Sequence, residues 1–233
     1  MHSSTLLTSI LAASALALPQ VQLEKRQQGN PGPSNVPPPA NGAPVDPGHT
    51  PGPQQAFLTV NSGLAYRNSI LFHHNQARAN HGSQPLVWNE TVAATAKITA
   101  DTCIFEHSVP DNVRQGQNLY TVSGDYFNVT AAITESWYKG EFPFMRNYYG
   151  ATDIPSNVFG QVGHLTQVVW NGTTSVGCYS LDCGNRMVVF GERQSSMNKY
   201  TVCNYWPAGN VRTQYALNVG RPRSNTDLGN YAD

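Results

Sequence analysis

The spacing of apolar residues changes about two thirds of the way along the chain, and this change limits the folds open to it. Up to residue 138 the apolar residues recur at helical spacing, which predicts three helices at 63–81, 89–101 and 130–138. After residue 174 they form short β-rich runs between turn residues, which predicts three antiparallel strands at 175–180, 187–192 and 199–206. Residues 116–120, between the two regions, are expected in a loop. The pattern predicts an α+β domain whose sheet packs between helical layers.

The first 55 residues have a different composition from the rest. An apolar run at 6–18 contains Ala15-Leu16-Ala17, which resembles a signal-peptidase site, so we expect a secretory signal peptide at 1–17. Lys25-Arg26 either ends a propeptide at 18–26 or is an ordinary pair of solvated charges. Residues 27–55 are rich in Pro, Gly and Asn and hold too few large apolar side chains to fold, so they are expected to form a disordered arm.

The folded domain is therefore expected at 56–219, followed by a polar tail at 220–233 that we expect to fray. The chain has 14 basic and 14 acidic residues, and only 12% of its residues are charged. Such a balance argues against nucleic acid or an anionic membrane surface as a partner. No further apolar stretch predicts a transmembrane helix. These features predict a secreted, extracellular protein, which we expect to be a monomer.

The cysteines and glycosylation sequons fit the same compartment. Four cysteines in an oxidising compartment predict two disulfides, and three connectivities are open: the cysteines are Cys103, Cys178, Cys183 and Cys203. Three Asn-X-Thr sequons are candidate glycosylation sites, at Asn89, Asn128 and Asn171.

Four separated segments carry the motifs of the chain. They are 74–78 (HNQAR), 116–119 (GQNL), 163–170 (GHLTQVVW) and 202–210 (VCNYWPAGN). In this order they resemble the CAP superfamily of cysteine-rich secretory proteins, insect antigen five allergens and plant pathogenesis-related class one proteins. The likeness extends over 64–219, and the secreted, proline-rich front end is similar to the fungal branch. In the first segment, His74, Asn75 and Arg78 are either functional or a solvated polar helix face.

The resemblance implies a fold and a cysteine pairing. It implies a three-layer α-β-α sandwich with a central antiparallel sheet, in agreement with the periodicity. It also implies the disulfides Cys103–Cys183 and Cys178–Cys203. A third bridge found in many relatives would join positions 115 and 206, which are Gln115 and Trp206 here, so both of its ends are absent.

The family also implies a central cleft in which two histidines and two acidic residues can hold a divalent metal. The matching positions are His107, Gln117, Glu141 and His164, so glutamine stands where relatives have glutamate. Relatives place the second acid three residues after the tryptophan, which is Gly140 here, so Glu141 serves only if the chain shifts by one residue. The alternative for His164, read alone, is a surface or satisfied histidine beside a turn, and for Glu141 it is a solvated charge. With one carboxylate lost, we expect weak, optional zinc binding by His107, Glu141 and His164.

The resemblance to fungal relatives implies binding of small apolar lipids, namely sterols or fatty acids. Eight aromatic residues are candidates for the lipid site, although each can equally belong to the core: Phe105, Tyr120, Tyr126, Phe127, Phe142, Phe144, Tyr148 and Tyr149. We expect no enzymatic activity, because neither Ser108 nor Thr166 has a base and an orienting group implied by the sequence. The alternative is an extracellular interaction module, or host-directed effector, that binds a host protein or the cell wall.

Overall fold

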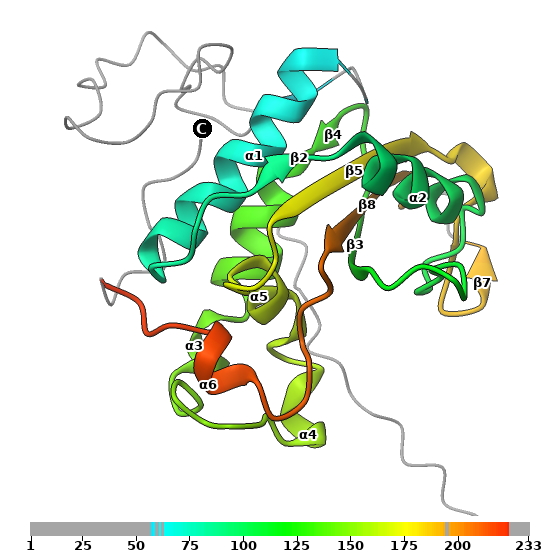
Figure 1. Cartoon of the computed structure of the whole chain (residues 1–233). Helices are drawn as coiled ribbons and strands as arrows, with labels where there is room; N and C mark the ends of the chain where they lie inside the picture. Colours follow the sequence, from blue (N-terminus) through cyan, green and yellow to red (C-terminus); the bar gives the residue numbers. More distant parts are fainter. Residues whose placement is uncertain (1–56, 59–60, 62, 194–195, 224–233) are drawn as a thin grey trace, which may run out of the picture. The chain divides into compact units, whose positions relative to one another are not determined.

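The computed structural model describes residues 57–58, 61, 63–193 and 196–223 (Figure 1). All of them belong to the unit Val36–Asp233. The signal peptide (1–17), the propeptide (18–26), the arm (27–55) and the tail from residue 224 onward are predictions that lie outside these residues. Within the described part, no helix has both the length and the apolar character needed to cross a bilayer.

Helices of three kinds occur. The α-helices are α1 (Gly63–Asn80), α2 (Glu90–Asp101), α3 (Phe142–Met145), α4 (Ser156–Phe159), α5 (Gly163–Val168) and α6 (Tyr215–Asn218). A π-helix, η1, covers Ala131–Lys139, and a 3₁₀ helix, η2, covers Gly184–Arg186. The three helices predicted from periodicity therefore correspond to α1, α2 and η1, with ends that differ by about one residue. Gly82, the predicted stop of the first helix, has a φ of +71°, which suits glycine after a helix end.

The central sheet has four strands in the order β2-β5-β8-β3, and they cover Val87–Trp88, Ser175–Asp182, Lys199–Trp206 and Gly116–Val122. Strands β5 and β8 are antiparallel, as expected, and β3 also pairs with β8 in the antiparallel sense, whereas the short β2 joins β5 in parallel. The expected loop at 116–120 is wrong, because β3 pairs with β8 along its whole length. The polar residues of β3 interrupt the alternation of apolar residues from which a strand is predicted.

Two small sheets complete the strands. Residues 187–192, predicted as one strand of the main sheet, instead contribute to a separate hairpin of β6 (Val188–Val189) and β7 (Glu192–Arg193). Strand β1 (Phe57–Leu58) pairs with β4 (Phe127–Asn128). The turn residues Phe190 and Gly191 both have positive φ, which ends β6 after two residues and folds the chain back.

Strand β8 is buried on both faces and divides the core in two. Cys203 and Tyr205 face a core that also contains residues of α1, η1 and α5. Tyr200 and Val202 point the other way, into a second core closed by α2. The sheet therefore lies between α2 on one side and a layer that includes α1 on the other (Figure 1), which is the predicted α-β-α arrangement.

Helix α2 is fixed on the sheet by its first residues. Asn89 caps it, because the Asn89 Oδ1 accepts the backbone N–H groups of Thr91 and Val92 at 3.0 and 3.2 Å. The helix then crosses β5 at Gly177, where a Cβ atom would lie 2.1 Å from the Ala93 nitrogen. Only glycine at this position of β5 allows so close an approach.

The two disulfides join the pairs implied by the family resemblance. Cys103, just after α2, is bonded to Cys183 across a sequence separation of 80 residues, and it fastens the end of the helix to the end of β5. Cys178 is bonded to Cys203 between the paired strands β5 and β8. No cysteine of the described residues is free.

The first residues of the tail are bound to the domain, so the expectation of fraying from Gly220 is wrong for 220–223. The Gly220 carbonyl accepts a hydrogen bond from His81 Nδ1 at 2.7 Å. The Arg223 N–H donates to the Asn80 carbonyl at 2.7 Å, and Arg221 donates to the Tyr149 carbonyl at 2.9 Å. These contacts close the carboxyl-terminal end of α1.

Candidate functional site

His164 and Glu141 form a tight pair at the start of α5. The His164 Nδ1 lies 2.5 Å from Glu141 Oε1, and the second carboxylate oxygen accepts the Leu165 N–H at 2.8 Å. Glu141 is only 9% exposed. The Trp137 ring stacks on the imidazole with an interplanar angle of 9° and a centroid distance of 6.1 Å. The carboxylate and the indole together fix the orientation of the His164 ring.

The π-helix η1 brings Glu141 to this position. The Gly140 N–H bonds to the Glu135 carbonyl, five residues back, at 2.8 Å. A π turn holds more residues than an α turn, so it absorbs one residue without displacing the residues after it. This geometry accounts for the one-residue offset between Glu141 and the family pattern, in which the acid falls at Gly140. The predicted shift is therefore found in the structure.

His107 and Gln117 form a second hydrogen-bonded pair. The Gln117 Oε1 lies 3.1 Å from His107 Nδ1 and accepts the Ser108 N–H at 3.2 Å. Its Nε2 donates to Thr99 Oγ1 and to Asn204 Oδ1, both at 3.0 Å. Gln117 thus orients His107 through its carbonyl oxygen, as Glu141 orients His164 through its carboxylate. The amide nitrogen adds bonds that a carboxylate cannot donate.

We call these four residues, His107, Gln117, Glu141 and His164, the polar quartet. Burial lowers the pKa of His107, and the charge of His164 lowers it further, while the bond to Gln117 opposes both. In the described part of the chain, however, no three His, Cys, Asp or Glu side chains form a group that could hold a metal ion. The expected ligands His107, Glu141 and His164 do not converge in that way.

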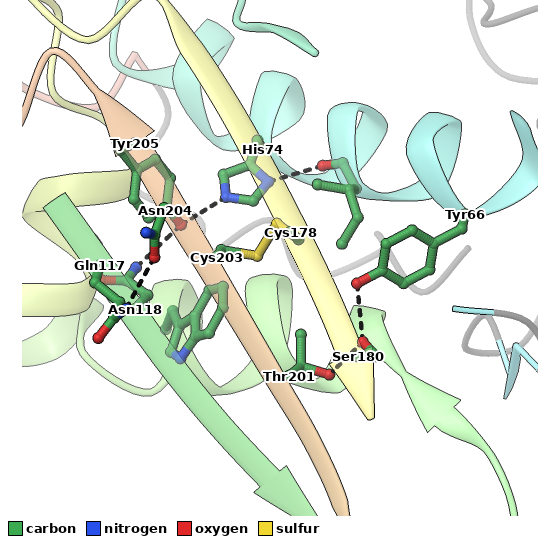
Figure 2. Close-up of a disulfide and its surroundings, with 12 residues drawn as sticks. Tyr66, His74, Gln117, Asn118, Cys178, Ser180, Thr201, Cys203, Asn204 and Tyr205 are labelled. Carbon is green, nitrogen blue, oxygen red and sulfur yellow. Dashed lines mark hydrogen bonds between the residues drawn. A yellow bond between two sulfur atoms is a disulfide. The ribbon is translucent and has the colours of Figure 1, made fainter. Parts of the chain in front are cut away.

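A buried chain of hydrogen bonds connects the quartet to α1 (Figure 2). His74 donates from Nδ1 to the Ile70 carbonyl, and its Nε2 lies 2.8 Å from the Tyr205 hydroxyl. Asn118 donates to the same hydroxyl at 3.2 Å and to the His164 carbonyl at 3.1 Å. Burial lowers the pKa of His74 to about 3, so the ring is neutral and its Nε2 accepts the Tyr205 proton. The network positions the backbone of His164.

Arg78 holds the opposite end of the same helix α5. Its side chain is fully buried and donates four hydrogen bonds of 2.7–2.9 Å to carbonyl groups, which belong to Gln84, Val168, Trp170 and Thr173. Burial lowers the pKa of Arg78 to about 10. The solvated polar face considered for His74, Asn75 and Arg78 is therefore wrong, because His74 and Arg78 are 0% exposed and Asn75 binds the Leu86 backbone.

The eight candidate lipid-site aromatics do not form one wall. Three of them, Phe127, Phe142 and Tyr149, are buried in the core. The accessible ones lie on separate elements: Phe105 after α2, Tyr120 on β3, Tyr126 before β4, Phe144 on α3 and Tyr148 after it. Of these, only Phe144 is on an element that begins beside Glu141. A further ring that the sequence did not single out, Phe159, is 40% exposed and lies against Gly163, next to His164.

A second site was not anticipated from the sequence. A surface hollow of 190 Å³ lies where α1, β2, α2 and β5 meet, and Arg67, Trp88, Glu90, Lys97 and Tyr179 are among its walls. These residues are far apart in sequence and follow no motif. The only local signal is Trp88, a large aromatic directly before the cap residue Asn89.

The three sequons differ in accessibility, which leads to a prediction about glycosylation. Asn171 is exposed in the turn after Trp170, whereas Asn128 is 9% exposed and its Oδ1 accepts the Ala131 N–H. A glycan needs room outside the fold. We expect Asn171→Gln to remove a glycan from protein secreted by a eukaryotic host, and Asn128→Gln to leave its mass unchanged apart from the substitution. Intact-mass and peptide mapping check this, and a glycan found on Asn128 of the folded protein would contradict it.

The fold and the quartet define a class of protein: an α-β-α sandwich with two histidines, each oriented by a hydrogen-bonded side chain. Comparisons with known proteins assign the chain to a family. A model of the cysteine-rich secretory protein family, CAP, matches residues 71–205. The chain therefore belongs to the CAP family.

Individual relatives support the assignment. A probable pathogenesis-related protein of Arthroderma benhamiae is 40% identical over 162 residues, which cover 69% of this chain and 50% of that protein. The chain thus spans about half the length of this relative. Pathogenesis-related protein 1A of Nicotiana tabacum is 36% identical and covers 67% of this chain and 85% of its own. Among solved structures, Na-ASP-1 has a TM-score of 0.52 at 21% identity, with coverage of 69% and 43%, and supports the fold.

Proposed function

We propose that this CAP protein is an extracellular, monomeric carrier that binds a small apolar lipid, a sterol or a fatty acid, at the polar quartet. The observation that carries the proposal is the position of exposed aromatic rings beside polar groups of fixed orientation. Phe144 is 43% exposed on the helix that begins after Glu141, and Phe159 lies against Gly163. A lipid hydroxyl or carboxyl group would bind the histidines while its hydrocarbon lies on the rings.

The proposal includes no enzymatic activity. The Glu141 carboxylate accepts hydrogen bonds from His164 Nδ1 and from the Leu165 N–H, so its position serves to orient the His164 ring. Thr166 is fully buried, and its hydroxyl bonds to backbone carbonyls and to Asn210. It is not available as a nucleophile. These contacts favour binding over hydrolysis.

Retention of radiolabelled cholesterol and palmitate by the purified protein, against a heat-denatured control, tests the lipid proposal. We expect Phe144→Ser to reduce retention several-fold without loss of stability, because the ring is exposed. Phe142→Ser is not a useful test, since Phe142 is 2% exposed and its loss would leave a cavity. Phe190→Ser, at another exposed ring, is the control. Retention that is unchanged in Phe144→Ser would contradict the proposed position of the lipid.

We also propose that divalent metal binding is weak and optional. The Glu141 carboxylate already accepts from His164 Nδ1 and the Leu165 N–H, so we take as the main ligands the Nε2 atoms of His107 and His164, for which the described residues supply no hydrogen-bond partner. Protein zinc sites use three or four protein ligands, so two imidazoles would hold the ion loosely. A zinc ion there would present a positive charge to a ligand oxygen. His107→Ala and His164→Ala should each abolish any zinc response.

An extracellular interaction module without lipid binding is the second candidate. Phe190 is 74% exposed at the tip of the β6–β7 hairpin, and its φ of +52° is unusual for a bulky residue. Ile104, 44% exposed, lies beside the same hairpin through its pairing with Val188. Apolar residues exposed together are typical of protein-binding surfaces. If neither lipid is retained above the denatured control, this candidate replaces the first.

A further inference from the structure

The surface hollow between α1, β2, α2 and β5 has fixed walls of mixed chemistry. The Arg67 guanidinium lies 5.6 Å from the centroid of the Trp88 ring and 2.5 Å from the Glu90 carboxylate. Lys97 lies 5.0 Å from the centroid of the Tyr179 ring and also binds Asp101. Each cation is therefore held by one aromatic ring and one carboxylate. Long side chains restrained in this way lose less entropy when they bind a ligand.

The charges at the hollow balance. Arg67 is paired with Glu90 and Lys97 with Asp101, so the site has no excess of either sign. An anionic ligand would have to displace a carboxylate from its cation, and a cationic ligand would have to displace a cation from its ring. At an exposed site, replacing one ionic contact by another yields little net free energy of binding. The charge pattern favours a neutral ligand that can both donate and accept hydrogen bonds.

The size of the hollow limits the ligand further. Its volume of 190 Å³ lies below the roughly 300–1,000 Å³ of pockets that enclose drug-sized molecules. A sterol skeleton does not fit inside it, but a single six-membered ring does. Trp88 and Tyr179 line the hollow and provide apolar surface for such a ring beside the cations that already contact them. Arg67 and Lys97 supply donors, and Glu90 supplies acceptors, for groups around its edge.

We propose that this hollow is a binding site for one neutral sugar ring, such as the end of a glycan chain. A pyranose has an apolar C–H face that packs on aromatic side chains, and hydroxyl groups that donate and accept at its edge. The five wall residues match both features. The hollow shares no residue with the polar quartet, so sugar binding here can be tested independently of the proposed lipid binding.

Ligand-observed saturation-transfer NMR of the whole protein tests the proposal with three probes: methyl β-D-glucopyranoside, methyl N-acetyl-β-D-glucosaminide and methyl α-D-mannopyranoside. A ring of about a dozen heavy atoms at the usual ligand efficiency gives a Kd of about 1–10 mM. We expect saturable binding of at least one probe in that range. Arg67→Ala and Glu90→Gln should each weaken it by about tenfold or more, because each removes an edge contact and frees its partner to move.

The matched control is Lys139→Ala. Lys139 forms an ion pair with Glu135 at helical spacing, as Lys97 does with Asp101, but it lies on η1 and outside the hollow. It should bind the probes like the native protein. Sodium benzoate and sodium decanoate, added as competitors, should not displace the sugar. The proposal is overturned if no probe saturates below about 100 mM, if either anion competes, or if Arg67→Ala and Glu90→Gln bind as well as Lys139→Ala.

Discussion

Replacing Arg78 by methionine is expected to lower the free energy of unfolding by about 3–5 kcal/mol. Methionine fills part of the space but donates no hydrogen bond, so the carbonyl groups of Gln84, Val168 and Thr173 lose the Arg78 donor, and the Trp170 carbonyl keeps only the Thr173 N–H. Each buried carbonyl left unsatisfied costs about 1–3 kcal/mol, and part of this is recovered because the charge is no longer buried. Lysine should also destabilise, since one ammonium group cannot span four acceptors set around a planar guanidinium.

Urea denaturation of the disulfide-intact protein measures the effect. The control is Arg212→Met, because the Arg212 side chain is 88% exposed and makes one ion pair, with Asp153. Its free energy of unfolding should change by no more than about 0.5 kcal/mol. An Arg78→Met protein as stable as the Arg212→Met protein would show that the four contacts contribute little. Arg78 would then be dispensable to the fold.

Replacing Gln117 by glutamate is expected to tighten zinc binding by about 10–100-fold. The new carboxylate would accept the His107 Nδ1 proton, as Glu141 accepts that of His164, and would make the His107 Nε2 a stronger ligand. The change loses the donations from Gln117 Nε2 to Thr99 Oγ1, to the Ser108 carbonyl and to Asn204 Oδ1. The Asn204 amide can rotate by half a turn to donate instead, and its other partner, Gln115, is an amide that can do the same.

Isothermal titration of metal-free protein with zinc chloride compares the native chain and Gln117→Glu. The controls are the double variants Gln117→Glu/His107→Ala and Gln117→Glu/His164→Ala. Neither should show the increase in zinc affinity expected for Gln117→Glu. Equal affinity in the native and Gln117→Glu proteins would mean that the outer carboxylate is not what limits metal binding here. A gain that survives loss of either histidine would place the zinc elsewhere on the protein.

Sequence reasoning located most of the fold and the four residues of the quartet, for identifiable reasons. The apolar periodicity gave the extents of α1, α2 and η1 to within about one residue. The family pattern supplied the quartet positions, which no periodicity could. Strand β3 was missed because its Gln117 and Asn118 side chains form hydrogen bonds to Asn204 and His164 and interrupt the apolar alternation.

Burial of polar residues was the other feature that the sequence could not supply. Histidine and arginine on a helix are usually solvated, so His74 and Arg78 gave no sign of being fully enclosed. Their burial depends on partners about 90 to 130 positions away in the chain, such as Trp170 and Tyr205. The sugar-sized hollow has the same origin, because its walls come together only when four elements pack.

The π turn that ends in Gly140 has a consequence for tracing this protein's ancestry. An added codon between Trp137 and the acid would ordinarily rotate every later side chain by about 100° around the helix axis and move the carboxylate away from His164. Because the wider turn absorbs the extra residue, such an insertion leaves the Glu141–His164 pair in place. Searches for relatives that demand a fixed tryptophan-to-acid spacing would therefore overlook genes with a working carboxylate.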